Sequence, residues 1–152
     1  MLKTLVVATD GSEVGDRALT DAIDLAGKLD ADLHVVHVIQ AGLYPSLFMD
    51  NIISPGIPAD PAQQAVYEML EREAEEILAR AADLAAAAGV RITTHRQFGD
   101  PGSEIVALAE EVGADLIIVG SRGKSGIDRF FLGSVSSFVI ERSPVATLVI
   151  RA

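Results

Sequence analysis

The sequence predicts an α/β protein in which a parallel β-sheet is covered by helices on both faces. Two observations support this fold class. Short runs of β-branched and leucine residues recur along the 152-residue chain, and stretches with helical hydrophobic spacing separate them. The resulting order, β-α-β-α-β-α-β-α-β, is typical of parallel sheets with right-handed crossover connections. We expect one domain over residues 1–152.

Five strands are expected at the β-branched and leucine-rich runs. The first and fourth runs are apolar throughout their centres, as strands are when both faces of a sheet are covered, so we expect them to be central. The third run alternates polar and apolar residues, which places it near an edge. In chain order the runs are Thr4–Thr9, Leu33–Ile39, Val90–Phe98, Asp115–Gly120 and Val145–Ile150.

Four helices are expected between these strands, with recognisable start and stop signals. Ser12 is the expected N-cap of the first helix, because its hydroxyl can accept a hydrogen bond from the first turn. The second helix is the longest and stops at Gly89. Pro101 and Gly102 precede the third helix, expected over residues 103–112, and the fourth is expected over residues 134–142.

The inward faces of these helices follow from apolar residues spaced three and four apart. In the second helix this stripe could also be read as a coiled-coil seam, but alanine at alternate positions favours close packing against a sheet. Helix by helix, the expected inward residues are Ala18, Leu19, Ala22, Ile23, Ala26 and Leu29; Tyr67, Leu70, Ala74, Ile77, Ala81, Leu84 and Ala88; Ile105, Leu108, Ala109 and Val112; and Val135, Phe138 and Val139.

The composition excludes several classes of function. The formal net charge of −10 disfavours binding to nucleic acids and to anionic membranes. The chain has no cysteine, which excludes disulfides, thiolate zinc sites and cysteine nucleophiles. No apolar run approaches the length of about 18 residues that spans a membrane. We expect a soluble, cytoplasmic protein.

One segment, residues 41–61, interrupts the regular alternation. It contains four of the six prolines together with apolar residues of an exposed type. A loop this long inside a small domain is usually functional or mobile. We interpret it either as a lid over a ligand or as a loosely packed excursion of the chain.

The candidate site lies where the first and fourth strands end. In a doubly wound sheet, ligands bind beyond the carboxyl ends of the strands, at the point where the strand order reverses. The two ends read Thr9-Asp10-Gly11-Ser12 and Val119-Gly120-Ser121-Arg122-Gly123. An aspartate, hydroxyl groups and glycines are therefore expected to line a crevice there.

The segment after the fourth strand, GSRGKSGIDRFFLGSVS, has the features of an anion site. Its glycines let backbone N–H groups approach an anion, and Ser134 begins a helix whose N-terminus attracts phosphate. Residues 119–142 hold four basic and two acidic side chains, a local charge of +2, contributed by Arg122, Lys124, Arg129 and Arg142 against Asp128 and Glu141. The segment therefore predicts binding of a small polyanion, with a flexible, solvated connector as the alternative.

Two common nucleotide-binding motifs are absent from the ends of the first and fourth strands. A P-loop requires a glycine five residues before Gly123, and Ile118 stands there. The turn after the first strand reads TDGSEVG, so a dinucleotide-binding G-x-G-x-x-G is absent as well. A Walker-type NTPase is thereby excluded.

Gly120, Gly123, Gly133 and Ser134 are spaced as G-x2-G-x9-G-(S/T) without a gap. In this spacing the chain resembles the universal stress protein family, whose nucleotide pattern it matches. The aspartate after the first strand, the end of the second strand at His37-Val38-Ile39 and the final SPVATLVI are similar to the family too. The resemblance covers the chain from its third to its next-to-last residue. It implies three layers, with a doubly wound five-stranded parallel sheet in the order 3-2-1-4-5 and four helices.

The resemblance also implies that ATP binds in the crevice. The backbone at Ala8 and Val38 would flank the adenine, although many members have proline where Ala8 stands, and Asp10 would face the ribose. Gly120 and Gly123 would admit the ribose and phosphates. The cradle for the β- and γ-phosphates would be formed by Gly133, Ser134 and Val135, with assistance from Ser136, and Val119 and Arg122 complete the set of expected cofactor-binding residues.

The resemblance further implies a homodimer formed through the last strand, VATLVI, which would otherwise be an exposed apolar edge. We expect an ATP-dependent sensor or regulatory module of the stress response with an unidentified protein partner. Mg²⁺ or Mn²⁺ is expected to arrive with the phosphates. Two alternatives stay open: a slow ATPase or phosphotransferase at the same site, and a sensor of AMP or a cyclic nucleotide.

No catalytic residue and no protein-held metal site are expected. Phosphoryl transfer requires metal neutralisation and a positioned base, whereas Asp10 is the only carboxylate placed in the crevice. His34 and His37 are three residues apart on a strand and point to opposite faces, so they cannot share a metal ion. His95 is isolated. We interpret all three histidines as ordinary packed or exposed side chains.

Overall fold

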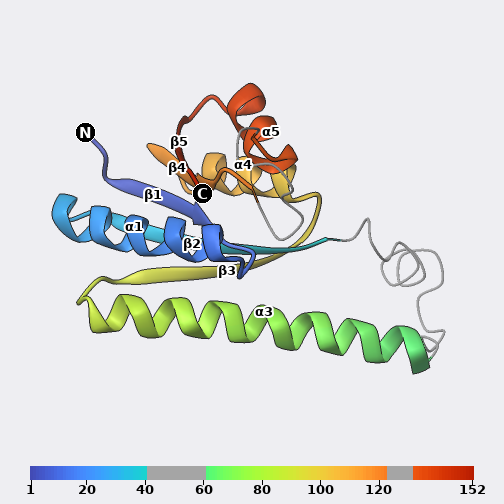
Figure 1. The fold of residues 1–152 in the computed structure, drawn as a ribbon. Helices are drawn as coiled ribbons and strands as arrows, with labels where there is room; N and C mark the ends of the chain where they lie inside the picture. The colour runs from blue at the N-terminus through green and yellow to red at the C-terminus, as the bar shows by residue number, and fades with distance from the viewer. Residues whose placement is uncertain (41–60, 123–131) are drawn as a thin grey trace.

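The computed structural model describes residues 1–40, 61–122 and 132–152, in which a parallel sheet lies between two layers of helices (Figure 1). The strands are β1 (Thr4–Ala8), β2 (Asp32–Gln40), β3 (Ile92–Gly99), β4 (Leu116–Gly120) and β5 (Ala146–Ile150). The helices are α1 (Glu13–Leu29), α3 (Pro61–Ala87), α4 (Pro101–Glu111) and α5 (Ser134–Arg142). The strand order is β3-β2-β1-β4-β5, which confirms the predicted fold class.

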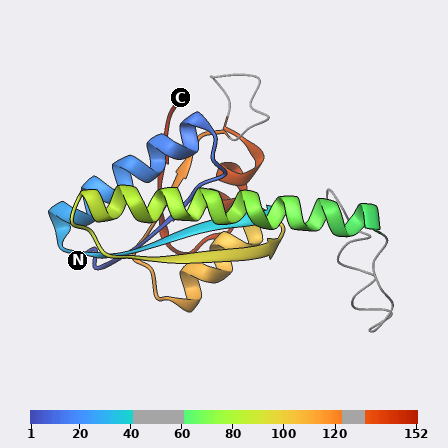
Figure 2. The ribbon, with the colours of Figure 1, turned by 90° about the horizontal axis from the view of Figure 1, so that it is seen from below.

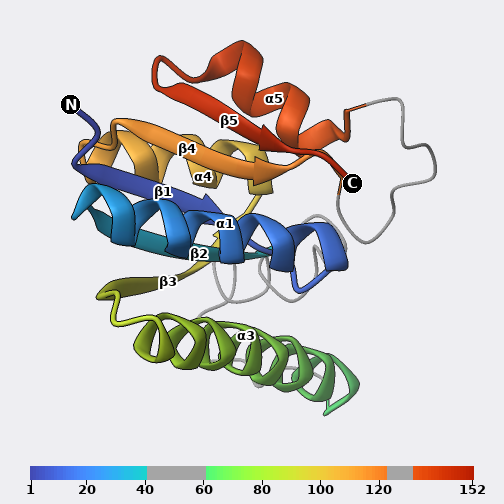
Figure 3. The ribbon, with the colours of Figure 1, turned by 60° about the vertical axis from the view of Figure 1, so that its left-hand side comes forward.

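Helices α1 and α3 cover one face of the sheet, and α4 and α5 cover the other (Figures 1 and 3). The central strand β1 contributes to both layers. Leu5 and Val7 belong to the core formed with α1 and α3, whereas Val6 belongs to the core formed with α4 and α5. All three side chains are fully buried. This explains why β1 is continuously apolar instead of alternating.

The strand order reverses between β1 and β4. The chain winds outward from β1 through β2 to β3 and then crosses back to β4, which pairs with the other side of β1. Asp115 joins the amino ends of these two strands, because its Oδ2 accepts hydrogen bonds from the backbone N–H groups of Lys3 (2.8 Å) and Thr4 (3.0 Å). These bonds hold the pKa of Asp115 below its usual range. At the opposite edge, the carboxyl ends of β1 and β4 lie side by side.

Helix α4 begins two residues earlier than predicted. Asp100 is its N-cap, and the carboxylate accepts hydrogen bonds from the backbone N–H (3.0 Å) and the hydroxyl (2.9 Å) of Ser103. Pro101 occupies the first helical position, where its missing N–H costs nothing and its fixed φ suits the helix. Pro101 and Gly102 thus form the first turn of the helix and do not precede it.

Helix α3 departs from its predicted stripe near its end. Ala74, Ile77 and Ala81 are buried as predicted, but the next buried residue is Ala85, and Leu84 is 42% exposed. Three turns of 3.6 residues from Ala74 end closer to Ala85 than to Leu84, so a step of four keeps the contact over the sheet. The first turns of α3 extend beyond the carboxyl edge of the sheet (Figure 2).

The interpretation of His95 as isolated is wrong. Its Nε2 lies 2.9 Å from Nδ1 of His34, and the ring centroids are 5.1 Å apart. In the β2–β3 register His95 pairs with Val36 and His34 with Thr93. His34, His95 and Val36 therefore share the sheet face that packs against α4. We call His34 and His95 the histidine pair.

Mild acidification is expected to destabilise the fold through the histidine pair. Burial and the neighbouring His34 lower the pKa of His95, and Glu111 acts in the opposite direction. The unfolded chain therefore takes up this proton more readily than the folded protein. The stabilisation by neutral His95 is present above the ordinary histidine pKa of about 6.5. It is lost as the pH falls through that value towards the lower folded pKa.

Denaturant unfolding of the wild type and of His95→Gln, at about pH 7.5 and about pH 5.5 on either side of the ordinary histidine pKa, measures this effect. The decrease in the free energy of unfolding should be smaller in the variant. An identical decrease in both proteins would contradict the assignment.

The predicted lid, residues 41–61, lies outside the described residues except for Pro61, which begins α3. Among the helices within the described ranges, none is both long enough and apolar enough to cross a membrane.

Candidate functional site

The candidate site lies at the carboxyl ends of three adjacent parallel strands. Ala8 is the last residue of β1, and Gly120 is the last residue of β4. Val38 lies two residues before the end of β2 at Gln40. The strands are in parallel register, with Ala8 opposite Val36. Residues far apart in the sequence are thereby brought to one edge of the sheet, where the strand order reverses.

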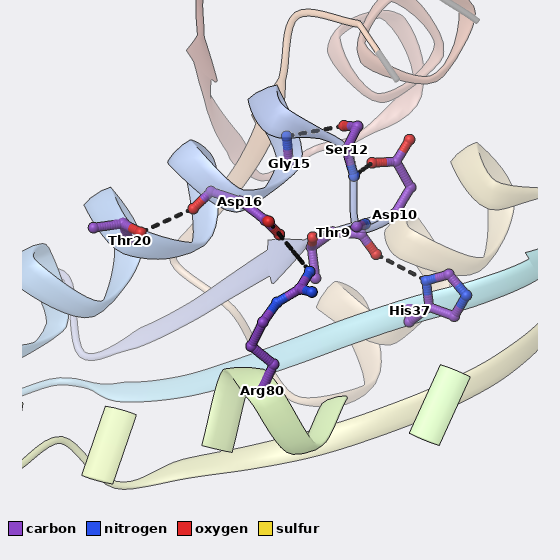
Figure 4. A network of polar contacts seen from close by, with 9 residues as sticks. Thr9, Asp10, Ser12, Gly15, Asp16, Thr20, His37 and Arg80 are labelled. Carbon is purple, nitrogen blue, oxygen red and sulfur yellow. Dashed lines mark hydrogen bonds and ion pairs between the residues drawn. The ribbon is translucent and has the colours of Figure 1, made fainter. Parts of the chain in front are cut away.

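The turn from β1 to α1 is held by its own side chains (Figure 4). The N–H of Gly11 donates to Thr9 Oγ1 (3.2 Å), and the N–H of Ser12 donates to Asp10 Oδ1 (2.9 Å). Ser12 Oγ accepts a hydrogen bond from the N–H of Gly15 (3.1 Å), which confirms Ser12 as the predicted N-cap. The turn fixes the half-buried Asp10 at the end of β1.

Glycine is required at Gly11 for two reasons. Its φ is +77°, which side chains rarely adopt. A Cβ there would also lie 3.0 Å from Ile77 Cδ1. Beside this contact, an Arg80 nitrogen lies 3.0 and 3.2 Å from the two carboxylate oxygens of Asp16, so α3 is tied to α1 next to the turn (Figure 4). No local sequence pattern marks Arg80 as part of this edge.

His37 holds the end of β1 in position. The residue is 8% exposed, and its Nδ1 lies 2.9 Å from the carbonyl oxygen of Thr9. A carbonyl oxygen can only accept, so Nδ1 carries the proton and donates. The N–H of Thr9 donates in turn to the carbonyl of Val36 (3.0 Å). His37 is therefore a positioning residue for the backbone between Ala8 and Asp10, and its only sequence signal was its place beside Val38.

The end of β4 is packed closely against α1 and β5. A Cβ on Gly120 would lie 2.8 Å from Val14 Cγ1, so this position admits only glycine without a shift of α1. The N–H of the following residue, Ser121, donates to the carbonyl of Ile150 (2.8 Å), and its hydroxyl accepts from the N–H of Ala152 (3.3 Å). These contacts fix the chain just before Arg122.

The N-terminus of α5 lies beside this segment. Its N-cap is Gly133, whose N–H donates to the carbonyl of Ser121 and which has no side chain of its own to cap the helix. The hydroxyl of Ser136 is buried within hydrogen-bond distance of the carbonyls of Ser121 (3.2 Å) and Gly133 (3.1 Å). Ser136 therefore locks the helix start, and the first N–H groups of the helix keep their capacity to bind an anion.

Arg122 adds a positive charge at the same place. Its Cα would lie 3.2 Å from a Cβ on Gly133, so Arg122 and the start of α5 are in close contact. Within the described ranges, one buried side-chain nitrogen or oxygen atom has no hydrogen-bond partner, and it is the Nε of Arg122. A buried, unpaired guanidinium N–H is costly, and next to a helix N-terminus whose N-cap is glycine it indicates a site for an anionic ligand.

The structure gathers most of the predicted site residues at this edge of the sheet. Gly123 lies outside the described residues, as do Lys124 and Arg129 of the predicted basic segment. No group of three or more histidine, aspartate or glutamate side chains in the described part of the chain is arranged to hold a metal ion. The gathered residues are Ala8, Asp10, Val38, Val119, Gly120, Arg122, Gly133, Ser134, Val135 and Ser136.

Comparison with known proteins agrees with this architecture. The model of the Universal stress protein family matches residues 1–151. Universal stress protein MJ0531 of Methanocaldococcus jannaschii is 35% identical over 153 residues, which is 99% of this chain and 83% of that protein.

Two solved structures show the same fold. Hypothetical protein MJ0577 superimposes with a TM-score of 0.81 at 26% identity, covering 100% of this chain and 97% of that one. A universal stress protein in complex with cAMP superimposes with a TM-score of 0.67 at 32% identity, covering 99% and 97%. With a family match across almost its whole length, the chain belongs to the universal stress protein family.

Proposed function

We propose that this protein binds ATP at the carboxyl ends of β1 and β4. The observation that carries the proposal is the start of α5, whose N-cap, Gly133, has no side chain to occupy the first N–H groups. The positive end of a helix dipole and its unpaired N–H groups together favour phosphate. Arg122 supplies a formal positive charge beside them, in a chain whose net charge is −10.

The other predicted contacts fit a nucleotide in this position. Asp10 at the end of β1 would hold the ribose, and the backbone at Ala8 and Val38 would flank the adenine. The N–H groups of Ser134 and Val135 would hold the phosphates, which would bring Mg²⁺ or Mn²⁺ with them. The related structure in complex with cAMP supports a nucleotide as ligand and makes a cyclic nucleotide the second candidate.

We also propose that the nucleotide-bound protein acts as a homodimeric regulatory module of the stress response. β5 is an edge strand, and Leu148 on it is 39% exposed. Pairing of β5 with its copy would cover this apolar edge. The dimer would leave the crevice between β1 and β4 to the nucleotide, because β5 lies beyond β4.

Titration calorimetry of nucleotide-stripped protein with ATP, AMP and cAMP tests the proposed function. ATP should bind and raise the melting temperature. Arg122→Met should weaken ATP binding by about tenfold or more, because a charge-assisted contact to phosphate is lost. Arg91→Met is the matched control: it makes the same change in charge at an exposed residue just before β3, near the amino ends of the strands, and should leave ATP affinity unchanged.

Absence of any ATP-dependent rise in melting temperature would overturn the proposal. Tighter binding of cAMP than of ATP would assign the site to the second candidate. Equal losses in Arg122→Met and Arg91→Met would show that Arg122 acts only through the net charge.

A further inference from the structure

We propose that the histidine pair, His34 and His95, is a binding site for a divalent metal ion of the zinc class. The pair lies on the sheet face that packs against α4, with His34 the third residue of β2. This is towards the amino ends of the strands, away from the crevice at their carboxyl ends. The inference is therefore independent of nucleotide binding.

The distance between the two nitrogens is close to, but shorter than, that of two ligands of one ion. Two imidazole nitrogens on one tetrahedral zinc ion lie about 3.3 Å apart, because each Zn–N bond is about 2.0–2.1 Å long. The observed distance from His34 Nδ1 to His95 Nε2 is 2.9 Å. The ring centroids are 5.1 Å apart. Shared coordination therefore requires a gap about 0.4 Å wider, with both rings turned to point at one ion.

The backbone holds the two histidines where the ion would need them. They lie on neighbouring strands whose parallel register extends over eight residue pairs. Both side chains are half-buried. Sites built on strands hold their geometry more accurately than sites on loops, and partial burial limits competition by water. Metal binding would cross-link β2 to the edge strand β3.

One carboxylate near the pair favours a cation. A histidine must be neutral to ligate a metal ion, as an ordinary histidine is at about pH 7.5. The carboxylate of Glu111, at the end of α4, interacts electrostatically with His95. Among the described residues no third ligand is yet in place, so Glu111 would have to rotate towards the pair. Two histidines, one carboxylate and a water molecule form a common four-coordinate zinc set.

The competing explanation is that the two nitrogens only share a proton. In a neutral pair one imidazole donates its N–H and the other accepts it, which also gives a distance of 2.9 Å. A shared proton requires no affinity for metal. Direct metal titration therefore separates the two explanations.

The experiment is calorimetric titration of untagged, nucleotide-free protein with zinc chloride at about pH 7.5, where an ordinary histidine is neutral. We expect one equivalent to bind. His34→Gln and His95→Gln should each lower the affinity at least about tenfold, since loss of a mere outer-shell partner already costs about that much. The chain has three histidines, so His37→Gln on the opposite sheet face is the matched control and should retain zinc binding.

Cobalt provides a second readout that needs no variant. Co²⁺ added to the wild type should give the visible absorption of a tetrahedral site, and Zn²⁺ should displace it.

The melting temperature of each variant, measured without metal, tests whether the variant is folded. The proposal is overturned if zinc fails to bind, or if all three variants bind it as the wild type does, and the pair then only shares a proton.

Discussion

The variant Ser134→Pro is expected to remain folded while its affinity for ATP falls by about tenfold to a hundredfold. The loss is this large because proline removes one charge-assisted hydrogen bond from the backbone N–H and one contact from the hydroxyl. Ser134 is the first helical residue of α5, after the N-cap Gly133. Proline is well tolerated at this position, because no intrahelical bond is lost. Gly133 has the extended backbone, with ψ of 167°, that a residue before proline adopts.

The matched control is Ser134→Ala, which removes the hydroxyl but keeps the backbone N–H. It should lose severalfold less affinity than Ser134→Pro. Titration calorimetry with ATP and AMP measures both variants, and AMP should be affected less if the lost N–H contacts the outer phosphates. Normal ATP binding by Ser134→Pro, with an unchanged melting temperature, would mean that the phosphates lie elsewhere.

Among the glycines that the structure describes, the largest effect on stability is expected at Gly102. This residue lies in the first turn of α4, is buried, and packs against α5. A Cβ there would lie 2.6 Å from Phe138 Cδ1 and 2.8 Å from Phe138 Cγ. Alanine is otherwise the better helix former, so the sign of the effect is set by this clash. Gly102→Ala should lower the free energy of unfolding by about 1–3 kcal/mol, the usual cost of overpacking.

A double-mutant cycle identifies the clash as the cause. Phe138→Leu alone should destabilise the protein, because it removes buried aromatic surface. Combined with Gly102→Ala it should recover part of the lost stability, since leucine leaves room for the new methyl group. Urea unfolding of the wild type and the three variants measures the coupling. Additive effects, or a Gly102→Ala protein as stable as the wild type, would contradict the prediction.

The elements that the sequence predicts well are those defined by local patterns. The apolar centres of β1 and β4 mark them as central strands, and the bounds predicted for α5 agree with the structure. The start of α4 was missed because Asp100 could be recognised as its N-cap only after Pro101 was placed inside the helix. In α3, the predicted inward face continued from Ala81 to Leu84, three residues on, whereas the next buried residue is Ala85, four residues on.

The contacts that the sequence could not predict join residues from distant segments. The histidine pair depends on the register of β3 against β2, and the bond from His37 to Thr9 depends on that of β2 against β1. The spacing of Gly120 and Gly133 did indicate the place of the candidate site. It could not show that Gly120 also admits Val14 of α1, because the packing of a helix on a strand is not encoded in either segment alone.

The placement of β1 between β2 and β4 has a consequence for how the protein is made. β1 is synthesised before β4, and Leu116, the β4 partner of Leu5, follows 111 residues later (116 − 5). Until then one backbone edge of the apolar strand β1 lacks its partner, and contacts of such long sequence separation slow folding and expose nascent chains to aggregation. Pairing of β1 with β4 therefore waits until the chain through β4 has left the ribosome.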